Sequence, residues 1–169
     1  MDLVVKGNYS EQFISDICFR VAETGDFLGF VRQYMYDEDK QVVRNALCAM
    51  TKTTDIELEQ LRPMMNELIE YAMRTDNPSI RRPLLGIVER MEMAEEDLRT
   101  DFLDFCFERM LCPDEAPSVQ ALCMKLANKM CRFYPELTEE LRRTLEAMDT
   151  SYYKPAVKSV RRNILTGKL

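Results

Sequence analysis

The stretch DKQVVRNALCAM, residues 39–50, decides the fold. Its apolar side chains recur at helical spacing, with Val42 and Ala49 on one face, and Asp39 stands where a helix N-cap is expected. The stretch therefore predicts an amphipathic helix. The same pattern returns at residues 77–88, from Ala116 and from Lys154. These intervals of about 38 residues are typical of helical repeats that stack into a solenoid.

Composition bounds the class of protein. The 169 residues are 46% apolar and 31% charged, and the net charge is −6, as in an ordinary soluble protein with a substantial core. No segment alternates convincingly as a β-strand would. No window approaches about 18 uninterrupted apolar residues, and residues 1–8 are too short and polar for a signal peptide. We therefore expect no membrane association and a cytoplasmic location.

The sequence offers no catalytic or metal-binding pattern. The chain has no histidine and six cysteines, which excludes histidine metal ligands and Ser–His or Cys–His catalysis. The cysteines form no C-x-x-C pair, so we expect small core residues of a reducing compartment. Pairs of carboxylates stand mainly at helix starts, where they complement the helix dipole. We expect no metal, no cofactor and no enzymatic activity.

Apolar spacing and turn signals predict an all-α chain of antiparallel helix pairs. We call the first helix of each pair the A helix and the second the B helix. The predicted A helices span residues 10–36, 55–75, 95–112 and 136–149, and Gly25 is a candidate break in the first. The predicted B helices span residues 39–52, 77–93, 116–133 and 153–165. Residues 1–169 are therefore expected to form one α-α superhelix, a solenoid domain of about four helix pairs.

Residues 30–47 resemble a HEAT repeat. They combine an apolar A helix, an acidic turn and a Val-Arg pair that opens an apolar B helix. Residues 68–88 are similar, residues 102–126 have Gln-Ala in place of Val-Arg, and the last pair departs further, as a terminal cap would. The resemblance implies that the A helices line the convex side of the solenoid and the B helices its concave side.

Charge separates the two sets of helices. Acidic residues dominate the predicted A helices and basic residues the predicted B helices. Together with the HEAT-like arrangement, this pattern predicts a basic concave surface on a moderately acidic protein. The candidate partner-binding residues are Arg44, Arg82, Arg90, Lys125, Lys129, Lys158, Arg161 and Arg162.

Two of these arginines have a structural alternative. Glu38 precedes Arg44 by six residues, and Asp76 precedes Arg82 by the same interval. HEAT-like units often pair an acidic turn residue with an arginine of a neighbouring repeat. Arg44 and Arg82 are thus candidates either for such a ladder or for contact with a ligand.

The favoured function is a non-enzymatic interaction module that binds an acidic segment of a partner protein. Nucleic-acid binding is the alternative, since basic residues could neutralise phosphates. The resemblance extends distantly to HEAT-like DNA alkylation-repair glycosylases, which use aromatic residues and a carboxylate in their groove. This chain has no tryptophan, and only Asp39 and Glu89 are candidate acids there, so catalysis is not expected. The oligomeric state is left open.

Overall fold

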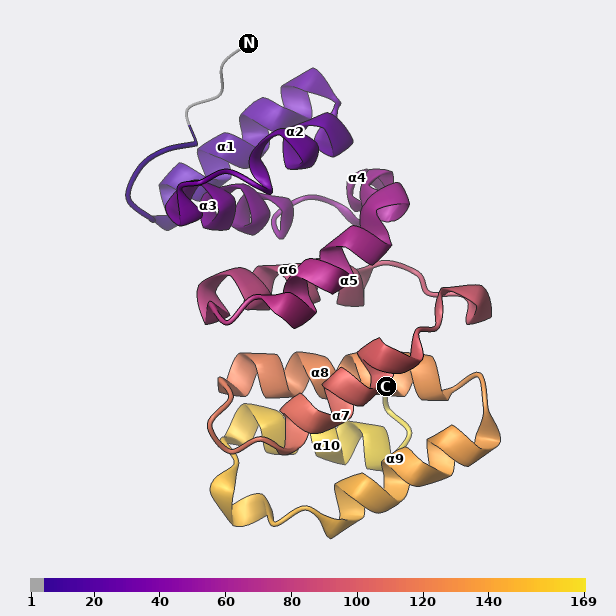
Figure 1. Ribbon diagram of the computed structural model, residues 1–169. Coiled ribbons are helices and arrows are strands. Elements are labelled where there is room, and N and C mark those ends of the chain that lie inside the picture. The colour runs from indigo at the N-terminus through magenta and orange to yellow at the C-terminus, as the bar shows by residue number, and fades with distance from the viewer. Residues whose placement is uncertain (1–4) are drawn as a thin grey trace. The chain divides into compact units, whose positions relative to one another are not determined.

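A computed structural model describes residues 5–169. The chain divides into two compact units, one that ends at Met91 (unit 1) and one that begins at Glu92 (unit 2) (Figure 1). Each unit contains two helix pairs, and the described residues include no β-strand. The predicted all-α architecture of helix pairs is confirmed.

Unit 1 contains two A-helix segments, each interrupted, and two B helices. Its helices are α1 (Glu11–Thr24), α2 (Phe27–Tyr34), α3 (Lys40–Met50), α4 (Asp55–Leu58), the 3₁₀ helix η1 (Glu59–Met64), α5 (Met65–Arg74) and α6 (Pro78–Arg90). Gly25 ends α1 with a φ of 71°, a left-handed conformation that glycine adopts without steric cost, so the candidate break is confirmed. Pro63 lies in η1, where the chain tightens between α4 and α5.

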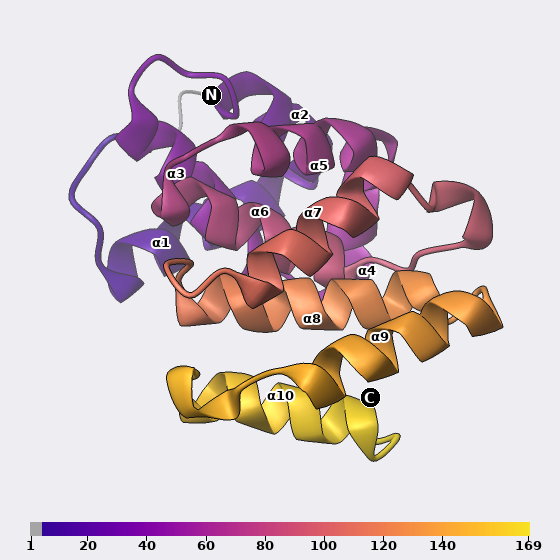
Figure 2. The same ribbon diagram turned by 60° about the horizontal axis from the view of Figure 1, so that its bottom comes forward.

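Unit 2 repeats the arrangement. Its helices are the 3₁₀ turn η2 (Glu95–Asp97), α7 (Thr100–Leu111), α8 (Pro117–Cys131), α9 (Pro135–Ala147), the 3₁₀ turn η3 (Thr150–Tyr152) and α10 (Pro155–Leu165). Figure 2 shows α7 lying along α8, followed by α9 and α10. Prolines begin α8, α9 and α10, where the missing N–H group has no helical partner to lose.

One predicted helix begins later than its sequence indicates. Residues 95–112 were expected to be continuous, but α7 starts only at Thr100. Leu98 and Arg99 have extended backbone conformations that separate the 3₁₀ turn from the helix. The Asp97 carboxylate accepts a hydrogen bond from the backbone N–H of Ala94, 2.8 Å away. The acidic run Glu95–Asp97 therefore forms its own turn.

The repeat register reappears in the core. Val42, Ile80, Val119 and Val157 hold equivalent positions in the four B helices, and all four are buried. Two turns later the equivalent residues Ala49, Ile87 and Leu126 are also buried, whereas Ile164 in the last helix is only half-buried. The prediction that this position belongs to the core holds for the first three helices but only partly for the last.

A second register position ties two of the B helices, α6 and α8, to their own A helices. The Arg81 guanidinium donates hydrogen bonds to the carbonyl oxygens of Ala72 and Thr75, at the end of α5. At the equivalent position of α8, Gln120 is 4% exposed and donates to the carbonyl oxygen of Cys112, 2.7 Å away. These bonds satisfy carbonyls that a helix end leaves without an internal partner.

Candidate interaction surface

Arg44, on α3, is half-buried and held by its neighbours. Its Cζ lies 5.1 Å from the ring centre of Tyr9, a cation–π distance, and one terminal nitrogen donates to Asn45 Oδ1 at 3.3 Å. Its Nε is buried and has no hydrogen-bond partner among the described residues. Glu38 is exposed and does not pair with it. Among residues 5–169, no ion pair joins Arg44 to an acidic turn residue, so the ladder alternative is not seen at this position.

Arg82, on α6, is exposed. Its side chain forms no hydrogen bond or ion pair within residues 5–169, so no inter-repeat pair with an acidic turn residue is seen there. An acidic residue six positions earlier lies in the turn before the B helix, whereas Arg82 points from the second turn of that helix. Among the described residues, Arg82 is a cation without an internal partner.

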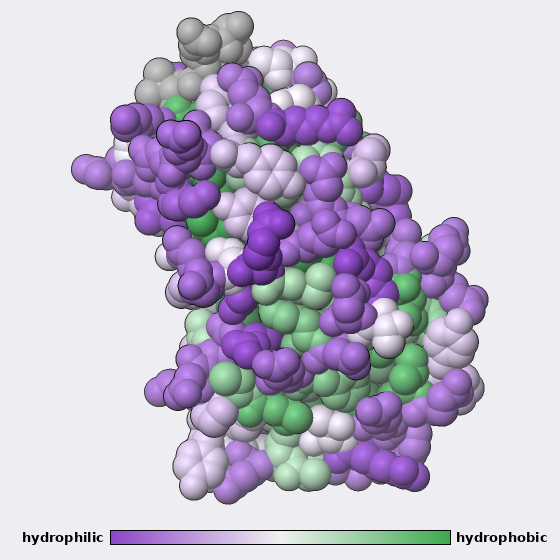
Figure 3. Space-filling model, viewed as in Figure 1, coloured by the Kyte–Doolittle hydropathy of each residue, from purple (hydrophilic) through white to green (hydrophobic). Residues whose placement is uncertain are grey.

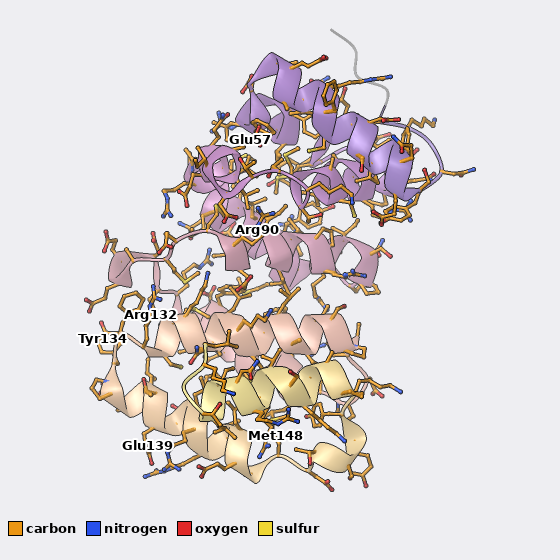
Figure 4. The ribbon with its side chains drawn as sticks, turned by 180° about the vertical axis from the view of Figure 1, so that it is seen from behind. Glu57, Arg90, Arg132, Tyr134, Glu139 and Met148 are labelled. Atoms are coloured by element: carbon orange, nitrogen blue, oxygen red, sulfur yellow. The ribbon has the colours of Figure 1, made fainter. Side chains whose placement is uncertain are left out.

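Arg90, the last residue of α6, has a structural role. Its guanidinium donates to the carbonyl oxygens of Thr51 and Thr53, at 2.9 and 2.7 Å, and to Asp55 Oδ1 at 2.8 Å. Figure 4 shows the side chain beside the segment that leads into α4, near Glu57. Arg90 thus anchors the second helix pair of unit 1 to the end of the first pair. Its cationic group is already occupied, which disfavours the predicted role in partner binding.

The candidates of unit 2 gather on two neighbouring B helices. α8 and α10 lie side by side in unit 2 (Figures 1 and 4). Lys125 and Lys129 are one turn apart on α8, and Lys158 and Arg162 are one turn apart on α10. Arg162 is exposed and the three lysines are half-buried. The structure therefore brings these four basic residues onto adjacent helices, and their role in binding a partner stays a prediction.

Arg161, the fifth candidate of unit 2, points elsewhere. Its Nε donates to the carbonyl oxygen of Leu145, in α9, at 2.7 Å. Like Arg90, Arg161 donates a hydrogen bond to a backbone carbonyl oxygen of another segment. The candidate residues thus divide into those that hold the fold and those that remain available to a partner.

Most arginines of the A helices, unlike Arg82 and Arg162, form ion pairs with carboxylates. In unit 1, Arg62 pairs with Glu59 of its own 3₁₀ helix at 2.8 Å. In unit 2, Arg142 pairs with Glu139 and with Glu146, and Arg143 pairs with Glu139 at 3.1 Å. Figure 4 shows Glu139 on the outer side of α9. Carboxylates on the same segment therefore neutralise much of the positive charge of the A helices.

The same contrast continues around α7. Arg99 pairs with Asp101 at 2.8 Å, and Arg109 pairs with Glu115 at 3.2 Å. On the B helices, no ion pair forms between a carboxylate and Arg82, Lys125, Lys158 or Arg162 in the part of the chain that the structure describes. These four residues form what we call the unpaired basic set. Arg82 belongs to unit 1, and the other three belong to unit 2. A basic stripe that runs over all four B helices stays a prediction.

The N-terminal segment contributes contacts that sequence reasoning missed. Asn45 is fully buried, and its Nδ2 donates to the carbonyl oxygens of Val5 and Gly7, at 2.9 and 3.1 Å. Lys52 Nζ lies 2.6 Å from a carboxylate oxygen of Glu11. A buried asparagine inside an amphipathic helix was the available signal, because a buried amide needs hydrogen-bond partners.

The described cysteines show no sign of reactivity. Cys106, Cys123 and Cys131 are buried, whereas Cys18, Cys48 and Cys112 are half-buried, so the prediction of core cysteines holds for the first three. Burial raises the pKa of the Cys18 and Cys48 thiols, and raises that of Cys131 to about 11. Thiols with a raised pKa are poor nucleophiles at neutral pH. Among residues 5–169, no group of three or more acidic or cysteine side chains is placed to hold a metal ion.

Repeated helix pairs with charged residues on their surface define the class of protein. The chain is a helical repeat protein. A family model for the HEAT repeat domain matches residues 2–168, so the chain belongs to the HEAT repeat family. Members of this family are helical repeat modules that commonly act as scaffolds for protein interactions and are generally not enzymes. A search of curated proteins found no match. Within the described residues, no helix is long and apolar enough to cross a membrane.

Proposed function

We propose that the protein is a non-enzymatic interaction module that binds an acidic segment of a partner protein through the basic surfaces of its B helices. One observation carries this proposal: within residues 5–169, Arg82, Lys125, Lys158 and Arg162 lack carboxylate partners, whereas most arginines of the A helices are paired. An unpaired cation on a surface is available to an incoming anion without first breaking an internal ion pair.

Nucleic acid is the second candidate ligand, and the same unpaired basic set supports it. Two observations weigh against it. The net charge is −6, which opposes the long-range attraction of a polyanion. Of the two candidate acids for a glycosylase-like site, Asp39 is used as the N-cap of α3 and accepts a hydrogen bond from the Gln41 N–H at 3.0 Å. We therefore favour a protein partner.

A cytoplasmic location belongs to the same proposal. All six cysteines are free thiols, which suits a reducing compartment. The proposal needs no cofactor, and it treats the acidic A-helix surfaces as solvated rather than as contacts with a partner.

Charge reversal tests the proposal. The protein is used to capture partners from its native lysate, with and without nuclease, as wild type and as the variants Arg82→Glu and Lys125→Glu. We expect nuclease-resistant capture of a protein that either reversal weakens, with Glu139→Ala as a control that leaves capture unchanged. Capture that disappears with nuclease would support the nucleic-acid alternative, and capture indifferent to both reversals would contradict the proposal.

A further inference from the structure

Four positions of unit 1 meet on one face of two packed B helices. Arg44 and Cys48 lie one turn apart on α3, and Arg82 and Gly86 lie one turn apart on α6. The two pairs occupy equivalent positions of the repeat, and α3 packs against α6. Residues one turn apart share a helix face. Both arginines lie near enough to the Cys48 thiol for their charges to act on it.

Both arginines act electrostatically on that thiol. Burial raises the pKa of Cys48, while the positive charges of Arg44 and Arg82 oppose the rise. The thiol is therefore neutral at neutral pH and cancels neither positive charge. The other charged groups that act on Cys48 are Glu11 and Lys52, which form an ion pair with each other at 2.6 Å.

Arg44 is already oriented. The Tyr9 ring lies against its guanidinium, and Asn45 accepts a hydrogen bond from it. Asn45 also donates to backbone carbonyls of the N-terminal segment, so the group that accepts from Arg44 is itself fixed. A cation held in place loses little conformational freedom when it binds an anion.

The site has room for a ligand. A Cβ atom added at Gly86 would meet no heavy atom within 4 Å. Arg82, one turn earlier on α6, is exposed. The face of α6 next to the two arginines is therefore open.

We propose that Arg44 and Arg82 form a binding site for a phosphorylated side chain of a partner protein. This inference rests on the proposed function, because it names one anionic group that the partner would carry. A phosphoryl group brings a charge of about −1.5 to −2 and three acceptor oxygens, which match two guanidinium groups. A carboxylate brings a single negative charge and would leave one arginine uncompensated.

The test uses the full chain and three fluorescein-labelled peptides. The peptides share a glycine-serine sequence and differ at one central residue, which is phosphoserine, glutamate or serine. Fluorescence anisotropy measures the affinity of each. We expect the phosphoserine peptide to bind at least about tenfold more tightly than the glutamate peptide, and excess inorganic phosphate to displace it.

Gly86 provides the matched variants. Gly86→Asp places a carboxylate in open space beside the arginines and should remove the preference for phosphoserine. Gly86→Ala adds only a methyl group and should keep the preference within about twofold of wild type. Arg82→Gln should also reduce it. Gly86→Ala shows whether a side chain at this position is tolerated. If only Gly86→Asp loses the preference for phosphoserine, the loss is due to its negative charge.

The outcomes separate this inference from the proposed function. Equal binding of the phosphoserine and glutamate peptides, or a preference that survives Gly86→Asp, would overturn the phosphoryl site. A single-stranded oligonucleotide is tested in the same way. If it binds as tightly as the phosphoserine peptide, and Gly86→Asp weakens that binding, the assignment to a protein partner is overturned. Loss of lysate capture in Lys125→Glu, together with equal peptide binding, would leave the proposed function standing and reject only this site.

Discussion

At the scale of single residues, two arginines of α6 have different contacts. Arg90 and Arg82 share a helix and a charge, yet Arg90 binds two backbone carbonyls and Asp55, whereas Arg82 has no such contact. The partners of Arg90 lie more than 30 residues earlier, in the turn after α3. No local spacing rule reports such a contact, because it depends on how two helix pairs pack.

Removal of the Arg90 side-chain charge should destabilise unit 1. Arg90→Gln loses hydrogen bonds from a charged donor, and two carbonyl oxygens lose a partner, so we expect a loss of about 1–3 kcal/mol in the free energy of unfolding. Arg82→Gln, on the same helix, should change it by less than about 0.5 kcal/mol. Urea denaturation followed by circular dichroism compares the two. Equal effects of the two substitutions would refute the structural assignment of Arg90.

The buried thiol of Cys131 should make stability depend on alkaline pH. Burial, and next the negative charge of Glu140, raise its pKa from 9.0 to about 11. Below the lower value the thiol is protonated in both states, so it adds no pH dependence. Between the two values the unfolded state loses the proton and the folded state keeps it, so stability falls as pH rises, by about 2–3 kcal/mol.

Cys131→Ala isolates this effect. The variant is less stable at neutral pH because it leaves a small cavity, but its stability should fall less steeply between pH 9 and pH 11 than that of the wild type. Denaturation curves at several pH values in this range measure both slopes. Parallel slopes for the two proteins would show that Cys131 does not titrate in this way.

At the scale of elements, helix positions were largely predictable because their signals are local. Asp39 and Asn77 cap α3 and α6 by accepting backbone N–H bonds, and Gly25 ends α1, as their residue types indicate. The start of α7 was not predictable in this way. The acidic run at residues 95–97 has the composition of a first helical turn, but the extended backbone at Leu98 and Arg99 separates it from the helix.

Gly86 should be a weak point of α6. Glycine in a helix interior is less favourable than alanine by about 1 kcal/mol, because the unfolded chain loses more conformational freedom. The methyl group that Gly86→Ala introduces would have open space, so this substitution should raise the free energy of unfolding by about 0.5–1 kcal/mol. Thermal and urea unfolding measure the change. A destabilised variant would mean that this face of α6 is not open.

At the scale of the whole molecule, basic residues lie mainly on the B helices, although the net charge of the chain is −6. The repeat register predicted which helices carry basic residues, and the buried positions Val42, Ile80 and Val119 confirm that register. Contacts of the N-terminal segment with Asn45 were not predictable, because that segment has no periodic pattern of its own. On the face shown in Figure 3, hydrophilic side chains predominate over unit 1, while hydrophobic ones emerge in patches over unit 2.

The proposed function requires that the unpaired cations of the B helices bind an acidic partner. The most direct measurement compares two triple variants with the same change in net charge, by anisotropy of a labelled glutamate-rich peptide. One variant replaces Lys125, Lys158 and Arg162 with glutamine, and the other replaces the paired Arg99, Arg142 and Arg143. We expect binding to weaken at least about tenfold in the first variant and less than about threefold in the second. Equal weakening of the two would contradict the proposed function, because binding would then follow net charge alone.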